Sequence, residues 1–462
     1  MKKYNFVLKF IIVFVLAIFM GAMVSPAKRF RANLQLTDYK NQILFLQQHG
    51  VDVAGVNYSQ KSVQVLVNEK QIEFLKAQGF NPEIIIRVEN VDEDYKSPDE
   101  IEALLKDYSS RYPGITKLVS IGKSLEGRDI WALKISDNPD VHEVGEPAIL
   151  FNGMHHAREV MTPEVPLDLI EVLINNYLSD DVLTRWVNSY EIWVVPMLNV
   201  DGNNKVWTED NWWRKNTRGG YGVDINRNYP YGWASCNGSS SNKNTDTYRG
   251  ESPGSEPETQ ALMGLVAQIR PVFDISFHSY GELVLYPYGC DGQRVETASV
   301  VEPIGQELAS RIKSDSGGGT YTAGVPWEIL YGVDGDDISW MYHEYQVIPF
   351  VIELNQDFQP EYGKYRDATV KKLRSAWTLL FKRLEEAGFY GQVIDNNLPV
   401  KNATLKISGE KYTQSYRVNP DGTFFIILNP GVYKLIVETP EKTTDAVMIE
   451  IGNLPLQKTI VL

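Results

Sequence analysis

Four long apolar runs constrain what this chain can fold into. They read PAILFNG (147–153), YEIWVVPMLN (190–199), VFDISFHS (272–279) and VIPFVIELN (347–355), and segments with helical spacing lie between them. Such alternation predicts an α/β sheet with helices on both faces. Ligands of open α/β sheets bind at the carboxyl ends of the strands. Each run ends in polar residues, and we expect these ends to share one site: His155 to Glu159, Asn199 with Asp201, His278 with Ser279, and Glu353.

Changes in pattern divide the 462 residues into four segments. Residues 1–27 precede a stretch, 28–94, that alternates strand-like runs with a helical run and ends in an acidic linker, which predicts a small α+β unit. The α/β pattern runs from near Tyr95 to near Phe389, so residues 95–389 form one predicted domain. Residues 390–462 are short alternating strands between Asn, Asp, Gly and Pro turns, which predict a small all-β sandwich.

The first 27 residues have the pattern of a secretory signal. Lys2, Lys3 and Lys9 precede an apolar run (10–24), and small residues follow up to Ala27. A membrane anchor is the alternative, but the run is shorter than the roughly 20 residues that a spanning helix needs. We therefore expect a secreted protein with no stable membrane span.

The charge of the chain narrows its possible partners. A formal net charge of -14 argues against nucleic-acid binding through a basic surface, because affinity for phosphates needs clustered Lys and Arg. A peptide or another small substrate fits better. The two cysteines, Cys236 and Cys290, either pair in an exported protein or remain free thiols, and both alternatives stay open.

Histidine spacing predicts a metal site. His156 has Glu159 three residues later, an offset that aims an imidazole and a carboxylate at one point, whereas His155 has Arg158 at that offset, which cannot bind a cation. With His278 as a distant third ligand, one coordination position stays open, as in a catalytic zinc site. The alternatives are a chance HxxE spacing and a histidine packed in the core.

Glu353 interrupts the apolar run VIPFVIEL. A buried ionised carboxylate without a partner costs several kcal/mol, so the residue needs a function or a counter-charge. A water activated by the metal is such a partner, and Glu353 is then a general base. An ion pair with an arginine, or an outward position on an edge strand, would also explain it.

The segments HHARE, FHSY and IEL, in this order, resemble the zinc metallocarboxypeptidases of the pancreatic A and B type and of bacterial carboxypeptidase T. The resemblance covers roughly Tyr95 to Phe389. It implies a mixed eight-stranded sheet, one Zn2+ held by His156, Glu159 and His278, and Glu353 as the general base.

Further segments extend the resemblance to the substrate site. NWWRKN implies that Arg214 stabilises the oxyanion, and VDINRN implies that Asp224 orients His156. The remaining implied contacts with substrate are Asn226 and Arg227 for its terminal carboxylate, Tyr331 as a mobile tyrosine that closes over that carboxylate, and Arg158, Ser279 and Tyr280.

Specificity is predicted from GVDGDDISW. Ile338 occupies the position where an apolar residue accompanies a preference for apolar C-terminal residues in the pancreatic relatives. Asp336 stands where carboxypeptidase T also has an acidic residue, so Lys or Arg would be accepted at a second point in the pocket. Because of Ile338, we still expect Leu, Phe or Met to be preferred and Lys and Arg to be removed more slowly. The alternative is that Asp336 and Asp337 face solvent in a turn with Gly335.

The flanking units also resemble parts of this family. Residues 28–94 are similar to a shortened inhibitory prodomain, which implies an activating protease that cleaves between about Arg87 and Lys96. Residues 390–462 are similar to the transthyretin-like modules of some carboxypeptidases. Two rival functions are a cell-wall peptide endopeptidase or amidase on the same scaffold, and a binding module without catalysis.

Overall fold

The computed structural model describes residues 29–57, 60–86, 90–290, 292–315 and 317–462. The predicted secretory signal lies outside the described residues. Among the helices of the described ranges, none is both long enough and apolar enough to cross a membrane.

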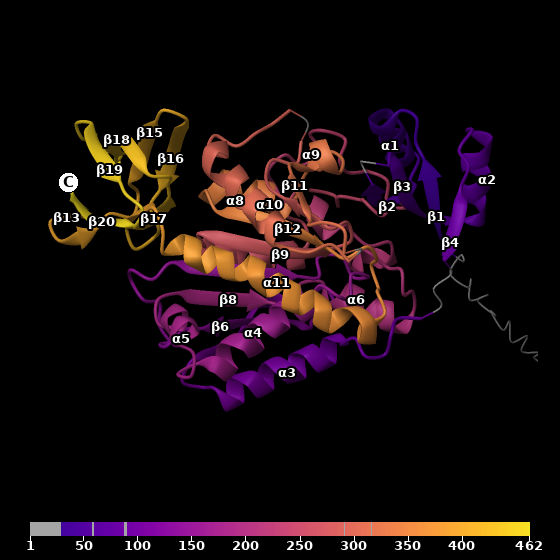
Figure 1. Ribbon diagram of the computed structural model, residues 1–462, viewed down its shortest axis with the longest axis horizontal. Helices are drawn as coiled ribbons and strands as arrows, with labels where there is room; N and C mark the ends of the chain where they lie inside the picture. Colours follow the sequence, from indigo (N-terminus) through magenta and orange to yellow (C-terminus); the bar gives the residue numbers. More distant parts are fainter. Residues whose placement is uncertain (1–28, 58–59, 87–89, 291, 316) are drawn as a thin grey trace, which may run out of the picture.

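An eight-stranded sheet forms the centre of the molecule (Figure 1). The four middle strands run parallel, and their neighbours on either side pair antiparallel with them. The sheet is therefore mixed, as expected. In spatial order its strands are β11 (Thr322–Gly324), β10 (Leu283–Leu285), β12 (Ile348–Leu354), β9 (Phe273–Ser279), β7 (Ala148–Gly153), β8 (Glu191–Val195), β6 (Asp129–Ile135) and β5 (Thr116–Lys123).

Helices cover the sheet. All residues of β7, β8 and β9 are buried, so both faces of the sheet are covered, and the prediction of an α/β fold is confirmed. The helices are α3 (Pro98–Arg111), α4 (Glu164–Asn176), α5 (Asp181–Val187), α6 (Val200–Thr208), α7 (Pro257–Ile269), α8 (Ala298–Arg311), α9 (Pro326–Ile329), α10 (Asp337–Tyr345) and α11 (Tyr362–Leu384), with short 3₁₀ turns η1 (Arg218–Gly220) and η2 (Ile225–Arg227).

The N-terminal unit, residues 29–86, is an antiparallel sheet with two helices at one end of the molecule (Figure 1). Its strand order is β2-β3-β1-β4. A capping box between Asn68 and Gln71 begins its second helix. The elements are β1 (Arg29–Gln35), α1 (Tyr39–Gln48), β2 (Asp52–Asn57), β3 (Ser62–Asn68), α2 (Glu69–Ala77) and β4 (Glu83–Ile86).

The C-terminal unit, residues 388–462, lies at the opposite end (Figure 1). It consists of strands alone, in two small sheets. Its buried residues belong to the same hydrophobic core as α11, so Phe389 and Phe424 share that core with Trp377. The strands are β13 (Gly388–Asp395), β14 (Leu398–Pro399), β15 (Thr404–Gly409), β16 (Tyr412–Arg417), β17 (Thr423–Ile427), β18 (Gly431–Glu438), β19 (Val447–Ile451) and β20 (Leu456–Val461).

Cys236 and Cys290 form a disulfide, so the alternative of two free thiols is wrong. Cys236 lies in the loop after η2, and Cys290 lies in the loop after β10. The bond therefore joins the loop after η2 to the loop after β10.

Candidate active site

Three neighbouring strands bring chemistry-bearing residues together at their carboxyl ends. His155 to Glu159 follow β7, His278 lies near the end of β9, and Glu353 lies near the end of β12. His278 and Glu353 are register partners in the parallel pairing of β9 with β12. The ends of three of the four predicted runs thus meet at one pocket.

The end of the run 190–199 does not line this pocket, so the expectation that all four ends share one site is wrong for it. Asn199 instead caps α6, and its side chain donates to the carbonyl of His155 at 3.0 Å. Asp201 is fully buried and accepts from Ser124 and Arg128. Asn199 thus supports the loop that carries the histidines, whereas Asp201 holds the turn after β5.

His156, Glu159 and His278 converge on one point. The Nδ1 of His156 lies 2.7 Å from Glu159 Oε1 and 3.2 Å from the Nδ1 of His278, which lies 3.3 Å from Glu159 Oε2. Two ligands of a tetrahedral zinc ion, each 2.0–2.1 Å from it, lie about 3.3 Å apart. This buried set of two imidazoles and one carboxylate therefore fits zinc, and it leaves a coordination position open.

A second group of possible ligands, His155, His278 and Asp337, shares His278 with the first. His155 is not among the residues that line the pocket, and its Nε2 lies 3.0 Å from the Tyr229 hydroxyl. Burial lowers the pKa of His155 to about 3, so its ring stays neutral. A substrate in the pocket would meet the first group, which therefore fits a catalytic zinc better.

The Nε2 atoms of His156 and His278 also lie close to polar side chains. Asp224 Oδ1 lies 3.3 Å from His156 Nε2, as the resemblance implied. Ser276 Oγ lies 3.2 Å from His278 Nε2. Partners of this kind fix the ring orientation and leave Nδ1 free for a metal.

A buried chain of polar side chains continues from Ser276. Its hydroxyl donates to Asn152 Oδ1 at 3.1 Å, and Asn152 Nδ2 donates to Asp274 Oδ1 at 2.8 Å. The sequence prediction missed all three residues. Their signal was the alternation in DISFH, which puts Asp274, Ser276 and His278 on one face of β9. Asn152 is the register partner of Ser276 on β7.

Glu353 lines the pocket beside these groups. Its strand, β12, lies between β10 and β9, so the alternative of an edge-strand position is wrong. Burial raises the pKa of Glu353 to about 8, while His278 acts against this rise and Glu159 adds to it. A carboxyl group with a raised pKa accepts a proton readily, which suits a general base.

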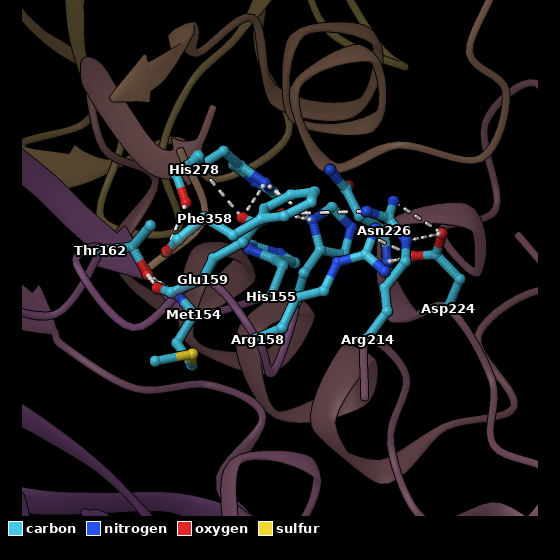
Figure 2. A network of polar contacts seen from close by, with 12 residues as sticks. Met154, His155, Arg158, Glu159, Thr162, Arg214, Asp224, Asn226, His278 and Phe358 are labelled. Atoms are coloured by element: carbon cyan, nitrogen blue, oxygen red, sulfur yellow. Dashed lines mark hydrogen bonds and ion pairs between the residues drawn. The ribbon is translucent and has the colours of Figure 1, made fainter. Parts of the chain in front are cut away.

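Arg214 is buried and is held by carboxylates (Figure 2). Its Nε and Nη2 donate to Asp224 Oδ2 at 3.1 and 2.9 Å, and its Nη1 lies 3.8 Å from Glu159 Oε1. Asp224 therefore contacts both Arg214 and His156. This fixes the guanidinium beside the candidate metal ligands.

Asn226 and Arg227 line another side of the pocket, together with Tyr331. The guanidinium of Arg227 is anchored by donation to the carbonyls of Gly238 (2.9 Å) and Asn226 (2.7 Å). Asn226 Oδ1 accepts from the backbone of Asp337 at 2.9 Å. A buried, immobilised guanidinium is suited to bind a carboxylate.

The loop of Gly238 is held by Asp334 and the disulfide. Asp334 Oδ2 accepts from the backbone of Cys236 and of Gly238 at 3.0 and 3.2 Å. A Cβ at Gly238 would lie 2.6 Å from backbone atoms of 332–334. Disulfide and carboxylate together thus position the carbonyl that anchors Arg227, a role that the sequence prediction missed.

The remaining wall of the pocket is mainly apolar. Leu285, Ile338 and Val351 belong to one buried cluster that lines it. Asp336 also lines it, and its Oδ1 accepts from the backbone of Ser339 at 2.9 Å at the start of α10. Burial raises the pKa of Asp336 to about 6. Asp336 and Asp337 are both buried, so the alternative that they face solvent is wrong.

Arg158, Ser279 and Tyr280 lie beside the pocket, next to the N-terminal unit. Asp52 of β2 forms an ion pair with Arg158, and Gln64 of β3 forms a hydrogen bond with the Tyr280 hydroxyl. Ser279 and Tyr280 line the pocket, whereas Arg158 is not among the residues that line it. The residues Val53 and Ala54, which follow Asp52, line the pocket itself.

Comparison with known proteins agrees with this arrangement. The model of the family described as zinc carboxypeptidase matches residues 101–377, more than half of the chain. Carboxypeptidase D of Rattus norvegicus is 29% identical over 361 residues, which are 73% of this chain and 24% of the relative. Metallocarboxypeptidase A of Trichophyton tonsurans is 33% identical over 284 residues, 59% of this chain and 65% of the relative.

A solved structure shows the same fold. Carboxypeptidase A from Helicoverpa armigera superposes with a TM-score of 0.67 at 23% identity and covers 77% of this chain and 96% of that chain. The chain spans about a quarter of the length of the carboxypeptidase D relatives that it matches. Zinc is the metal of the matched family, and the donor set above fits it. The chain belongs to the zinc carboxypeptidase family.

Proposed function

We propose that this protein is a secreted carboxypeptidase that removes the C-terminal residue of peptides and proteins. The observation that carries the proposal is the meeting, in one pocket, of three zinc-ligand side chains, a carboxylate with a raised pKa, and two arginines. Each of these groups would have a separate role.

His156, Glu159 and His278 would hold the zinc ion. When bound there, zinc would supply Lewis-acid activation of a water molecule and of the scissile carbonyl. Glu353 would take a proton from the attacking water and deliver it to the leaving amine. Asp224 and Ser276 would keep the two imidazoles in the tautomer that leaves Nδ1 free for the metal.

Arg214 would stabilise the negative charge that develops on the carbonyl oxygen of the substrate. Its guanidinium is already fixed by Asp224, so little reorganisation is needed during the reaction. Its contribution should therefore fall on the chemical step more than on the binding of the ground state.

Asn226, Arg227 and Tyr331 would bind the terminal carboxylate of the substrate. Arg227 is fixed by two carbonyls and faces the pocket, where a chain end is the anion that a guanidinium can hold with two hydrogen bonds. This arrangement supports an exopeptidase over the cell-wall endopeptidase or amidase. The complete set of reactive groups argues against a binding module without catalysis.

The apolar wall with Ile338 would favour Leu, Phe or Met at the C-terminus. Asp336 gives a Lys or Arg side chain a partner at one point, but burial works against the charged form of that carboxyl group. We therefore expect Lys and Arg to be removed more slowly. Ser279 and Tyr280 would contact the substrate upstream of the scissile bond.

The N-terminal unit would act as an inhibitory prosegment. Its residues Val53 and Ala54 line the pocket, and Gly55 lies so close to the Tyr280 ring that a Cβ there would be 2.5 Å from it. A peptide substrate would compete for the same space. Removal of this unit by an activating protease would then open the groove.

The position of the activating cleavage can be narrowed. Tyr95 donates to the Pro360 carbonyl at 2.7 Å, and Lys96 pairs with Glu164 at 2.9 Å. Because Val91 is also buried, the chain after Asn90 is anchored on the catalytic domain. We therefore place the cleavage before Val91, in the first part of the predicted window. In this proposal the predicted signal, residues 1–27, directs export, and cleavage of the N-terminal unit then gives the active enzyme.

Product analysis tests this function. The processed protein is incubated with a peptide ending in Leu, and the products are identified by mass. We expect stepwise loss of residues from the C-terminus, loss of the activity on treatment with a zinc chelator, and recovery on addition of zinc. Internal cleavage products, or trimming that a chelator leaves unchanged, would refute the proposal.

A further inference from the structure

We propose that the disulfide between Cys236 and Cys290 is a redox-controlled clamp on the subsite for the terminal carboxylate of the substrate. While the bond is closed, it holds the loop that anchors Arg227. When a dithiol reductant opens the bond, the substrate binds more weakly, but the candidate zinc ligands keep their positions. This inference rests on the proposed carboxypeptidase function and adds a means by which substrate binding is regulated.

The loop after η2 connects the disulfide to Arg227. Gly238 follows Cys236 by two residues, and its carbonyl accepts from Nε of Arg227 at 2.9 Å. The carbonyl of Asn226 accepts from a different nitrogen of Arg227, Nη1, at 2.7 Å. Because a guanidinium holds a carboxylate with two hydrogen bonds only in a fixed orientation, a shift of Gly238 would weaken the binding of the substrate's chain end.

Asp334 also holds this loop. Its Oδ2 accepts from the backbone N–H groups of Cys236 at 3.0 Å and of Gly238 at 3.2 Å. The Asp334 side chain is buried, and its Oδ1 has no hydrogen-bond partner in the described part of the chain. A buried carboxylate that lost these two donors would cost free energy, so the loop and Asp334 stabilise one another. The disulfide and Asp334 therefore act on one short segment.

The disulfide also contacts the segment that carries Tyr331. The Sγ atoms of Cys236 and Cys290 lie 3.7 and 3.6 Å from the carbonyl oxygen of Val333. The backbone N–H of Val333 donates to the carbonyl of Gly289, the residue before Cys290, at 2.9 Å. Three loops thus meet at the disulfide, and Tyr331 lies two residues before Val333. Opening the bond would therefore loosen two of the residues proposed to bind the terminal carboxylate.

The candidate zinc ligands do not depend on these three loops. In the described ranges, the side chains of His156, Glu159 and His278 make hydrogen bonds and ion pairs with one another and with Arg214, Asp224, Ser276 and Ser279. All four of these partners lie outside the loops that meet at the disulfide. Opening the bond should therefore affect substrate binding more than zinc binding or the chemical step.

Cys236 is the accessible half of the bond. It is partly exposed, whereas Cys290 is buried. Cys236 also lines a pocket of about 260 Å³, which is lined as well by Leu44 and Gln47 of α1. Removal of the N-terminal unit takes these α1 residues away, so a reductant reaches the bond more easily in the processed enzyme.

The proposed reduction is a thiol–disulfide exchange. A thiolate of the reductant attacks Sγ of Cys236, the bond to Cys290 breaks, and Cys290 leaves as a thiolate that takes up a proton. The second thiol of the reductant then attacks its own sulfur in the mixed disulfide and releases Cys236, which is protonated in turn. The reductant is thereby oxidised from a dithiol to a disulfide, and both cysteines are reduced to thiols.

The kinetics of the processed enzyme before and after reduction test the inference. The substrate is a peptide with a free C-terminal Leu, the reductant is dithiothreitol, which is removed before the assay, and thiol titration verifies that the bond is open. We expect KM to rise about tenfold, kcat to change by less than about twofold, and zinc to remain bound. Reoxidation should restore the original KM.

Variants separate the clamp from other effects of the reductant. The double variant Cys236→Ser/Cys290→Ser should have the raised KM from the start and should not respond to dithiothreitol. Asp334→Ala should raise KM about tenfold with the disulfide intact, whereas Asp334→Asn keeps an oxygen acceptor and should retain a KM near that of the wild type. Asp367→Ala, at an exposed position of α11, is the control for the loss of an aspartate.

An unchanged KM after verified reduction would overturn the clamp, as would a KM of Asp334→Ala equal to that of the wild type. Loss of zinc from the reduced wild type, but not from the treated double variant, would also overturn it, because the bond would then hold the metal site. If the double variant does not fold, reversible reduction of the wild type and the Asp334 variants decide the question. Failure of the carboxypeptidase function looks different, since then the untreated enzyme would release no Leu.

Discussion

At the scale of single residues, the proposed site depends on side chains that orient the proposed zinc ligands. His278 must keep Nδ1 free of a proton to bind a metal, so Nε2 carries the proton and needs an acceptor. Ser276 Oγ is that acceptor, and it is fixed in turn by Asn152 and Asp274. The proposed metal site therefore includes buried polar side chains beyond its three proposed ligands.

Ser276→Ala should weaken zinc binding by about 10–100-fold, because His278 loses the partner that fixes its ring. The dissociation constant for zinc is measured by competition with a chelator, independently of activity. Ser310→Ala on the exposed face of α8 serves as the control and should bind zinc like the wild type. Unchanged zinc affinity of Ser276→Ala would show that Ser276 does not position His278.

Glu353→Gln should lower kcat by about 10²–10⁴-fold and leave one zinc ion bound per chain, since a base is lost while the ligands remain. His156→Ala and His278→Ala should lose zinc as well as activity. Metal content and turnover are measured on the same samples. Near-normal turnover of Glu353→Gln with zinc bound would remove this residue from the mechanism.

At the scale of elements, His142 connects the C-terminal unit to the sheet. Its Nδ1 lies 3.1 Å from Glu191 Oε1 on β8, and its Nε2 lies 3.0 Å from Asp421 Oδ2 before β17. Burial lowers the pKa of His142, but the hydrogen bonds and charges of Asp421 and Glu191 outweigh it, so the net pKa is raised. Lys134 shares the Glu191 carboxylate at 2.9 Å.

This contact predicts a dependence of stability on pH. Because the pKa of His142 is higher in the folded state, its contribution to stability is complete below the unfolded pKa of about 6.5 and is lost as pH rises through the folded pKa. His142→Asn should therefore lower Tm near pH 6 and have little effect near pH 9. A difference in Tm that stays constant over this range would contradict the assignment.

The elements also show what could be predicted from the sequence. The runs that became β7, β8, β9 and β12 were recognisable because strands buried on both faces need continuous apolar residues. The three-residue strands β10 and β11 are too short to give such a pattern. The shared core of the C-terminal unit and α11 depends on tertiary packing, which the separate strand patterns of 390–462 do not contain.

Part of the candidate site was also predictable from the sequence. The spacing of His156 and Glu159 and the placement of Glu353 within an apolar run gave local signals, and the resemblance supplied Arg214, Asn226 and Arg227. The carboxylate of Asp52 lies about a hundred residues before its partner Arg158, at a sequence separation of 106, and no local pattern joins them. The same holds for Asp334 and the loop of Gly238.

At the scale of the whole molecule, Val53 and Ala54 of the N-terminal unit line the pocket that a substrate would use. The uncleaved chain should therefore be much less active on peptides than the processed chain. Asp52→Asn in the uncleaved chain should raise this low activity, because loss of one partner of a buried ion pair costs about 3–5 kcal/mol and weakens the docking of the unit. Glu73→Gln on the exposed side of α2 is the control.

Activity of both uncleaved variants is compared with that of the uncleaved wild type on one peptide. Equal activity of uncleaved and processed wild type would mean that the N-terminal unit does not inhibit. An unchanged low activity of Asp52→Asn would mean that the pair with Arg158 does not hold the unit in place.

The central claim is that the pocket recognises the free end of a peptide chain. Its most direct test is the ratio of kcat/KM for two peptides of identical sequence, one with a free C-terminal carboxylate and one with a C-terminal amide. The amide leaves Arg227 without its anion, so we expect the free acid to be favoured by about 10²-fold or more. Equal cleavage of acid and amide would contradict the account and favour an endopeptidase or amidase.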